Sequence, residues 1–519
     1  MVRYRLPRLG GGADNAPQRM RTAHQHMAES RPIRAGKRRH ASLALSVGGP
    51  ILLAGCSFAP AHVRPAQPVP QEYPGAAIPG TSIAHIGWYD FFREEHLRAL
   101  IAAALENNRD IRIATARIAE ARASWRIEGA ALYPELNAVG TGTRGRSIIN
   151  LPGLGTQSYD VKQVSAQLSA GWEIDFWGRL RNLREAARDQ YLATEEARRA
   201  VATDLVSQVA NGYLLEREYE ERVAIAQRTI TTREEALRIM RRRYEVGSGS
   251  KLEMTQAQML LAQAQTTLQS LDQDRAVNRN ALALLVGRQM EIPPGPLGLV
   301  EAAPEINLPA GLPSELLANR PDILAAEYRL RAADANIGAA RAAFFPNINL
   351  TAAFGAASSD LDGLFGDGNR SWSFTPTITQ PLFNAGRLAA NLDVVKARQV
   401  AAVADYEKTV QVAFRDVSDA LVRRRQLALQ IQTTRTVLDA LQERARLAQL
   451  RFNNGRSAYL EVLDAQRDLF ETEQALVQLR RGHLASAVAL YAALGGGFVG
   501  RAASDGSATI IQSSGEQAR

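Results

Sequence analysis

The feature that most constrains the fold is an internal repeat. Residues Arg243–Gly247 correspond to Arg451–Gly455 at a separation of 208 residues, and the same separation relates Leu252-Glu253 to Leu460-Glu461. Other pairs keep this spacing: Gly178-Arg179-Leu180 with Gly386-Arg387-Leu388, Leu282 with Leu490, and Gly287 with Gly495. Upstream the separation becomes 212, as in Asp110-Ile111 with Asp322-Ile323 and Pro134 with Pro346. The chain is therefore predicted to fold as two related units.

Each copy is dominated by one very long helix. We predict these helices over Arg179–Val246 and Arg387–Asn454, and the second contains neither Gly nor Pro. At 1.5 Å per residue such a helix reaches roughly 100 Å, more than a globular domain needs. A shorter helix precedes the strands of each copy, and a return helix follows each turn: Glu94–Leu132, Ser314–Phe345, Leu252–Val286 and Tyr459–Leu494. The turns, Gly247–Ser250 and Gly455–Ser457, reverse the chain.

Two strands are predicted in each copy, because apolar and polar residues alternate there. The apolar positions are Leu136 and Ala138; Val164, Ala166, Leu168, Ala170, Trp172, Ile174 and Phe176; Ile348, Leu350, Ala352, Phe354 and Ala356; and Trp372, Phe374, Ile378 and Leu382. Gly363–Gly368 lies between the last two strands and is predicted to be an extracellular hairpin. The alternation fits a transmembrane barrel with lipid outside. It equally fits one face of a soluble sandwich, the more usual outcome for such strands.

Four strands and two long helix hairpins need neighbours. Four strands cannot close a wide pore, and open edges in lipid leave unpaired backbone groups. A helix of this length is stable only beside helices that bury its apolar stripe. A membrane interpretation therefore requires several chains to share one barrel.

The N-terminus has the pattern of a secretory signal. Arg31–His40 is basic and Ala41–Leu53 is apolar or small, too short for a stable membrane span. The segment ends in Leu53, Ala54, Gly55 and Cys56, and Cys56 is the only cysteine of the chain. This run resembles the bacterial lipobox, which implies that Cys56 is acylated and becomes the first residue after cleavage. Ser57 after it resembles the signal for outer-membrane delivery. The alternative is an ordinary buried cysteine.

Charge and composition exclude several classes of function. Of the formal net charge of +9, residues 1–55 carry +8 (ten Lys/Arg, two acids), so the remainder is nearly neutral. No basic patch for nucleic acid is therefore expected. The histidines after the signal, His62, His85, His96 and His483, are far apart in sequence, and no nucleophile–base arrangement is evident. We expect no enzyme activity and no cofactor.

These boundaries divide the chain into six parts, with Pro-rich connectors before each copy. They are a signal region (1–55, removed), an acylated extended linker (56–87), repeat 1 (88–290), a Pro-rich linker (291–313), repeat 2 (314–497) and a flexible C-terminal tail (498–519). The predicted fold class is mixed and mainly α.

With these motifs in this order, the sequence resembles the outer membrane factors, the TolC-type efflux family, in its NodT/OprM-like lipoprotein branch. The resemblance spans about Trp88–Gly497. The segments that carry it are Trp88-Tyr89-Asp90-Phe91-Phe92, Leu97, Leu100-Ile101, Ala104-Leu105, Asn108 and Asp110-Ile111; Tyr133-Pro134 and Phe345-Pro346; Asn319-Arg320-Pro321-Asp322-Ile323; and Leu463-Asp464-Ala465-Gln466.

The resemblance implies a homotrimer with a twelve-stranded β-barrel in the outer membrane and a tunnel of twelve helices in the periplasm. It implies docking of the helix turns, at Gly247, Gly455 and Arg456, on a periplasmic adaptor protein. Through the adaptor the duct would meet an inner-membrane pump of the RND type, while outer-membrane lipid would surround the barrel.

The resemblance also points to Glu461 and Asp464 as the periplasmic aperture. The two acids stand three residues apart on one helix face just after the second turn. Around a threefold axis they would form a ring that attracts cations. The first copy has Glu253 and Gln256 at these positions. The alternative is that they are acids favoured by the helix dipole.

The expected function is a passive outer-membrane exit duct of a tripartite efflux system. Two alternatives are a duct for type I protein secretion and a non-conducting, structural coiled-coil lipoprotein. The second alternative would explain the helices but leaves the alternating strands unexplained.

Overall fold

A computed structural model describes residues 57–73, 86–151, 155–294 and 313–496, all within one compact unit, Gly55–Arg519. Repeat 1 comprises α1 (Trp88–Phe91), α2 (Glu95–Asn107), α3 (Arg109–Ala130), β1 (Glu135–Leu151), β2 (Gly155–Ile174), α4 (Arg179–Glu245) and α5 (Lys251–Val286). Repeat 2 comprises the 3-10 turn η3 (Pro313–Glu315), α6 (Leu316–Asn319), α7 (Pro321–Ala342), β3 (Asn347–Ser358), η4 (Leu361–Gly363), β4 (Arg370–Thr379), α8 (Arg387–Asn453) and α9 (Tyr459–Ala493).

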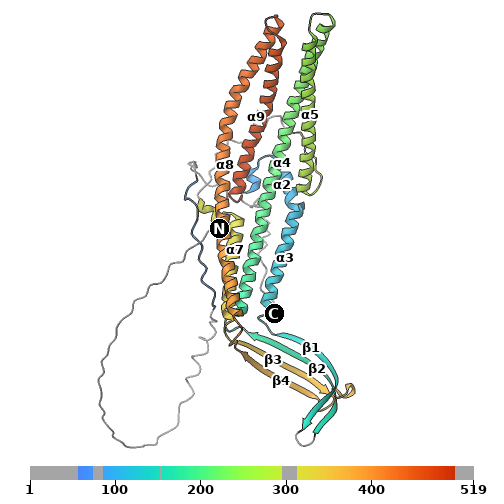
Figure 1. The fold of residues 1–519 in the computed structure, drawn as a ribbon, viewed down its shortest axis with the longest axis vertical. Coiled ribbons are helices and arrows are strands. Elements are labelled where there is room, and N and C mark those ends of the chain that lie inside the picture. Colours follow the sequence, from blue (N-terminus) through green and yellow to red (C-terminus); the bar gives the residue numbers. More distant parts are fainter. Residues whose placement is uncertain (1–56, 74–85, 152–154, 295–312, 497–519) are drawn as a thin grey trace, which may run out of the picture. The chain divides into compact units, whose positions relative to one another are not determined.

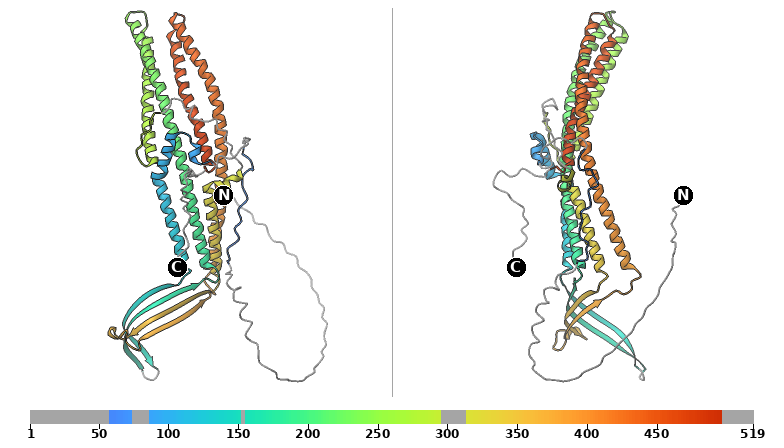
Figure 2. Two further views of the ribbon diagram at one scale, coloured as in Figure 1. Left: turned by 180° about the vertical axis from the view of Figure 1, so that it is seen from behind. Right: turned by 90° about the vertical axis from the view of Figure 1, so that its left-hand side faces the viewer.

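The two long helices are confirmed. Both α4 and α8 have 67 residues and end one residue before the predicted boundary. The strands lie at one end of these helices and the two hairpin turns at the other (Figure 1). Helices α3 and α7 run beside the strand-proximal halves of α4 and α8, and the return helices α5 and α9 run beside the other halves (Figure 2). Within the described residues, no helix has the length and apolar character to cross a membrane.

The single helices predicted over Glu94–Leu132 and Ser314–Phe345 are wrong, because each is broken near its start. Asn108 has an extended backbone, and its side chain accepts hydrogen bonds from the backbone N–H groups of Asp110 and Ile111, capping α3. In repeat 2 the break is at Arg320, whose ψ of 118° is non-helical because Pro321 follows. The two breaks are counterparts under the 212-residue offset.

Both breaks are fastened to the end of a return helix. Asn108 donates a hydrogen bond from Nδ2 to the Leu285 carbonyl (2.8 Å), and Arg320 donates from a guanidinium nitrogen to the Ala493 carbonyl (3.0 Å). Leu285 and Ala493 are themselves counterparts, 208 residues apart. Different side chains therefore bond the helix break to the return helix in the two repeats.

The strands form one antiparallel sheet in the order β1-β2-β3-β4. Cross-strand pairing aligns Ala138, Leu168, Phe354 and Trp372 in a single row, so the alternating apolar residues share one face. The side chains of these four residues are exposed in the single chain, and no described helix packs across this face. The strand β4 ends at Thr379, three residues short of Leu382, just before Pro381.

Glycines with positive φ mark the repeat in the backbone. Gly178, Gly247 and Gly287 (φ 76–78°) have counterparts at Gly386, Gly455 and Gly495 (φ 68–92°), each 208 residues on. A Cβ at Gly287 would meet the Asn107 carbonyl oxygen at 2.6 Å, and one at Gly495 would meet the Asn319 carbonyl oxygen at 2.5 Å. These two positions thus require both a left-handed conformation and the absence of a side chain.

We expect Gly495→Ala to destabilise the protein more than Gly455→Ala. Both residues lie in the left-handed region, which costs a side chain about 1–2 kcal/mol. Only Gly495 also has backbone within 3 Å of the added Cβ, whereas nothing lies within 4 Å at Gly455. The measurement is the thermal midpoint of helical circular dichroism of the purified protein in detergent. Equal midpoints for the two variants would contradict the close approach at Gly495.

Candidate aperture at the helix turns

The two turns that end α4 and α8 lie near each other and are closed by equivalent bonds (Figure 1). The Ser248 N–H donates to the Arg243 carbonyl (2.8 Å), and the Arg456 N–H donates to the Arg451 carbonyl (2.8 Å). Gly247 and Gly455 provide the positive φ that each reversal requires. Arg456 itself is exposed.

A small apolar cluster joins the two hairpin tips. It contains residues of all four helices: Met240, Ala257, Leu260, Ala448, Phe452, Tyr459, Val462, Leu463 and Ala465. The rings of Phe452 and Tyr459 are 4.9 Å apart, and the Arg243 guanidinium lies 5.0 Å from the Phe452 ring. Burial raises the pKa of Tyr459. The tips therefore pack as one unit within the chain.

Glu461 and Asp464 lie in the first two turns of α9, and each is paired with an arginine. The Glu461 carboxylate is 3.5 Å from Arg451 on α8, and that of Asp464 is 3.3 Å from Arg467 one turn further along α9. Both acids keep exposed side chains, at 48% and 39%. The partner Arg467 could have been found from its i,i+3 spacing, but Arg451 lies across the turn and has no such signal.

A third acid extends this face of α9 and was missed by the sequence analysis. Asp468 accepts hydrogen bonds from Arg444 on α8 (2.7 Å) and from Arg467 (3.0 Å). The hydrogen bond from Arg444 is the largest cause that lowers the pKa of Asp468. The acids near the second turn thus lie within a network of arginines.

The lipobox residues, Leu53, Ala54, Gly55 and Cys56, lie outside the described part of the chain. The residues that follow them are seated at the junction of helices and strands. The Ser57 hydroxyl donates to Asn182 Oδ1 (3.0 Å), the Arg341 guanidinium donates to the Phe58 carbonyl (3.0 Å), and the Phe58 ring stacks on Phe345 at 4.7 Å. No sequence pattern indicated these contacts.

Further along, this N-terminal segment is held by polar contacts to α7. His62 Nδ1 is 3.0 Å from Asp334, and Arg64 is 2.7 Å from the buried carboxylate of Glu327. Burial raises the pKa of Glu327, but hydrogen bonds from Arg331 and Arg64 outweigh it and leave the pKa below its usual value. The residues after Cys56 therefore have a defined seat on the helices.

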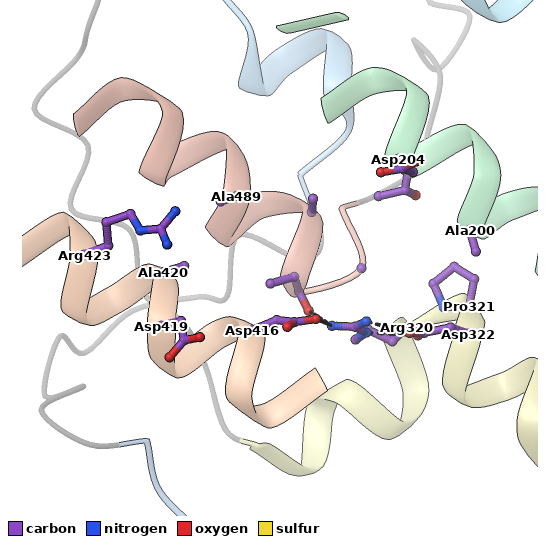
Figure 3. A pocket seen from close by; sticks show the side chains of 14 residues that line it. Ala200, Asp204, Arg320, Pro321, Asp322, Asp416, Asp419, Ala420, Arg423 and Ala489 are labelled. Atoms are coloured by element: carbon purple, nitrogen blue, oxygen red, sulfur yellow. Dashed lines mark hydrogen bonds and ion pairs between the residues drawn. The ribbon is translucent and has the colours of Figure 1, made fainter. Parts of the chain in front are cut away.

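A cavity of about 490 Å³ lies where α4, α7, α8 and α9 meet (Figure 3). It is lined by Asp204, Asp322, Asp416 and Asp419 together with Arg320 and Arg423. Arg320, at the break before α7, lies 2.5 Å from the Asp322 carboxylate and 3.5 Å from that of Asp416. Two of these four acids are therefore already paired with an arginine. In the described residues, no three His, Cys, Asp or Glu side chains could jointly hold a metal ion. We therefore interpret this cavity as a feature of the packing where the helices meet.

Two strand hairpins carried on two long helix hairpins are the architecture of a channel subunit. Comparison with known proteins agrees. The family model "Outer membrane efflux protein" matches residues 100–288 and 312–496. The solvent efflux pump outer membrane protein SrpC of Pseudomonas putida is 42% identical over 458 residues, 86% of this chain and 97% of SrpC.

Two further relatives are equally well covered. The probable outer membrane lipoprotein SilC of Salmonella typhimurium is 40% identical, with 88% of this chain and 98% of SilC aligned. The cation efflux system protein CusC of Escherichia coli O157:H7 is 40% identical over 86% of this chain and 97% of CusC. A crystal structure of CusC superimposes with a TM-score of 0.78 over 85% of this chain and all of that chain.

The chain belongs to the outer membrane efflux protein family. It is an outer-membrane exit duct of an efflux system, with its helices in the periplasm, and the resemblance found from its sequence is confirmed. The family is one of transport channels.

We expect Tyr459→Ala to loosen the tips. Tyr459 is 2% exposed, and truncating a buried aromatic side chain costs about 3–5 kcal/mol. Limited proteolysis of the purified protein should then cut the two turns faster. Leu460→Ala, at the neighbouring 51%-exposed position, is the control and should leave the cleavage rate unchanged. Equal cleavage of the two variants would show that the apolar cluster does not hold the tips.

Proposed function

We propose that three copies of the chain form one duct, with a shared barrel and a shared helical tunnel. The observation that supports this is a difference in burial between the two repeats. Helix α4 has twenty buried residues and its counterpart α8 has seven. Helix α7 has thirteen and its counterpart α3 has one, while α9 has thirteen and α5 has seven. Of two equivalent helices, one is therefore covered by other helices of the chain and the other is largely uncovered.

The missing neighbours follow from the repeat. Within the described residues, repeat 1 meets repeat 2 mainly through three contacts, α4 with α7, α4 with α9, and β2 with β3, beside a smaller contact of α5 with α9. If each element is replaced by its counterpart in the other repeat, these contacts become α8 with α3, α8 with α5, and β4 with β1. Only another copy of the chain can supply these partners. The faces left open carry exposed apolar side chains, among them Val394, Val400, Val422 and Leu450 on α8, Ile113 and Ile127 on α3, and Val277 and Leu284 on α5.

Such a contact is head-to-tail, so repetition of it generates a ring. With three copies, as the family resemblance implies, four strands per copy give twelve strands in one closed barrel. Closure removes the open edges of β1 and β4, which lipid would not tolerate. The exposed apolar row Leu168, Phe354 and Trp372 would then face lipid, with Gly363–Gly368 outside the cell.

We further propose that Glu461 and Asp464 line the periplasmic aperture. The comparison of the two turns favours this over helix-end stabilisation. In repeat 1, Glu253 forms a capping box with Ser250, which explains the acid. In repeat 2, Ala458 replaces that serine, no side chain caps α9, and Glu461 is nevertheless present. Arg451 and Arg467 would then hold these acids in the closed tip and compete with bound cations for them.

The anchor and the partners complete the proposal. Cys56 would be the acylated first residue, and its lipid would enter the outer membrane at the helix–strand junction where Ser57 and Phe58 are seated. One relative is named as a probable outer membrane lipoprotein, which supports an anchor of this kind. The turns at Gly247, Gly455 and Arg456 would dock on a periplasmic adaptor, which joins the duct to an inner-membrane pump of the RND type. Relatives of similar identity are named for cations and for solvents, so we infer that the pump selects the cargo.

Native mass spectrometry of membrane-extracted protein tests the assembly and the anchor together. We expect three chains per particle, each beginning at Cys56 and carrying the additional mass of acyl groups. A stable monomer with its full β content would contradict the shared barrel. An unprocessed N-terminus with a free thiol would contradict lipidation and leave the assembly result standing.

Neutralising both aperture residues, as Glu461→Ala with Asp464→Ala, should weaken cation selectivity and block by divalent or trivalent cations from the periplasmic side. The reason is that six carboxylates in a narrow ring attract cations and repel one another. The measurement is conductance in planar bilayers, with native mass as the control for assembly. Glu253→Ala is the matched control in the first turn and should leave selectivity as in the wild type. If the double variant also keeps wild-type selectivity and block, the acids stabilise only the helix end.

A further inference from the structure

A buried network of ion pairs joins α4 to α9 within the chain. The Glu218 carboxylate, 2% exposed as a residue, accepts hydrogen bonds from Arg481 Nε on α9 (2.8 Å) and from Arg222 on α4 (2.9 Å). Arg222 Nε donates to Gln474 Oε1 (2.7 Å), and Gln474 returns a bond to the Arg222 carbonyl (3.1 Å). Arg480 on α9 lies 3.4 Å from Glu221. This contact is therefore polar, charged and largely shielded from water.

The repeat predicts the equivalent contact between copies, and its residues differ. The counterparts of Glu218, Glu221 and Arg222 on α8 are Gln426, Leu429 and Gln430. The counterparts of Gln474, Arg480 and Arg481 on α5 are Thr266, Asp272 and Gln273. All six are exposed in the single chain. Advanced by one repeat, the three pairs become Gln426 with Gln273, Leu429 with Asp272, and Gln430 with Thr266.

We propose that α8 of one copy docks on α5 of the next in this register, and that this contact contains no ion pair. The proposal rests on the assembly of copies proposed above and adds to it the residues that meet. Its consequence is mechanical. Separating α4 from α9 would break the ion pair between Glu218 and Arg481 and the hydrogen bonds between Arg222 and Gln474. Separating α8 from the next copy's α5 breaks no such pair, so a loosening tunnel parts between copies before it parts within one.

The charged residues nearby define the competing arrangement. On α8 the closest cation to Leu429 is Arg425, one turn away, with Arg423, Arg424 and Arg435 further along. On α5, Asp274 and Arg275 flank the three positions, and Arg275 already pairs with Glu216 at 2.7 Å. A shift of one turn would bring Arg425 to Asp272 of the neighbouring copy. Asp272→Asn distinguishes the two registers.

Disulfide trapping tests the register in the full-length, membrane-extracted protein. Gln430→Cys with Thr266→Cys should give covalent dimers and trimers on a non-reducing gel. The control pair, Arg222→Cys with Gln474→Cys, is the same contact inside one chain and should give only monomers. Trimeric native mass without intermolecular disulfides would overturn the register. If the wild-type protein showed no trimeric mass, the proposed assembly itself would be overturned.

The absence of charge is tested by the equilibrium of the same intermolecular disulfide in a glutathione buffer. It should not change between low salt and 1 M salt, nor with Asp272→Asn. Adding Gln426→Glu and Gln273→Arg together should favour the disulfide about two- to five-fold at low salt, as a new ion pair would, and the gain should vanish in 1 M salt. Each single change should give no gain. A wild-type contact that is weakened by salt or by Asp272→Asn would overturn the proposal.

Discussion

Everything in this protein depends on finding neighbours for two helices of 67 residues. A helix of that length has no core of its own, so it is stable only where other helices cover its apolar residues. Within each repeat, an antiparallel return helix covers half of the long helix and a shorter helix covers the other half. The second repeat supplies the rest for α4, but no other described element does so for α8. The assembly of several chains proposed above therefore follows from the requirements of the helices themselves.

The two repeats share a backbone and divide the side-chain roles differently. Their common frame is set by glycines at identical offsets and by close approaches at Gly287 and Gly495. On this frame, Asn108 and Arg320 perform the same fastening with different chemistry. The capping serine of the first turn becomes Ala458 in the second. Glu218, Glu221 and Arg222 of α4 are replaced by neutral residues on α8. The two repeats therefore share one geometry, while their side chains place ion pairs between α4 and α9 and neutral residues at the equivalent positions of α8.

The sequence predicted the elements whose signals are long or periodic. The long helices were placed to within one residue, and the alternation placed strands two to four, because both patterns persist over many residues. The break at Arg320 could have been predicted from Pro321, whereas the break at Asn108 depends on a side-chain cap that competes with an otherwise helical pattern. The first strand was indicated only by Leu136 and Ala138, yet it extends to Leu151 because β2 pairs with it throughout.

The sequence analysis named the candidate site residues but not their partners. Glu461 and Asp464 follow a turn that is visible in the sequence, whereas Arg451 reaches Glu461 only because the chain reverses between them. The seat of the N-terminal segment is similar. It joins residues such as Arg64 and Glu327 that are hundreds of positions apart, through single contacts with no periodic signal.

The asymmetry between the hairpins also explains where an aperture can form. In repeat 1, the buried Arg233 donates to the Leu260 carbonyl of its own return helix (2.6 Å) and lies 5.1 Å from the Phe470 ring of α9. Burial is the main cause that lowers the pKa of this arginine, so its position is costly and is held by the packing around it. Its counterpart on α8 is Leu441, which can make neither the hydrogen bond nor the cationic contact. Near its tip the first hairpin is therefore tied within itself and to α9, and Leu441 gives the second hairpin no equivalent tie. In the proposed duct, the acids at the second turn would belong to the less constrained hairpin, where a change in their charge or pairing would alter the aperture without disturbing the rest of the tunnel.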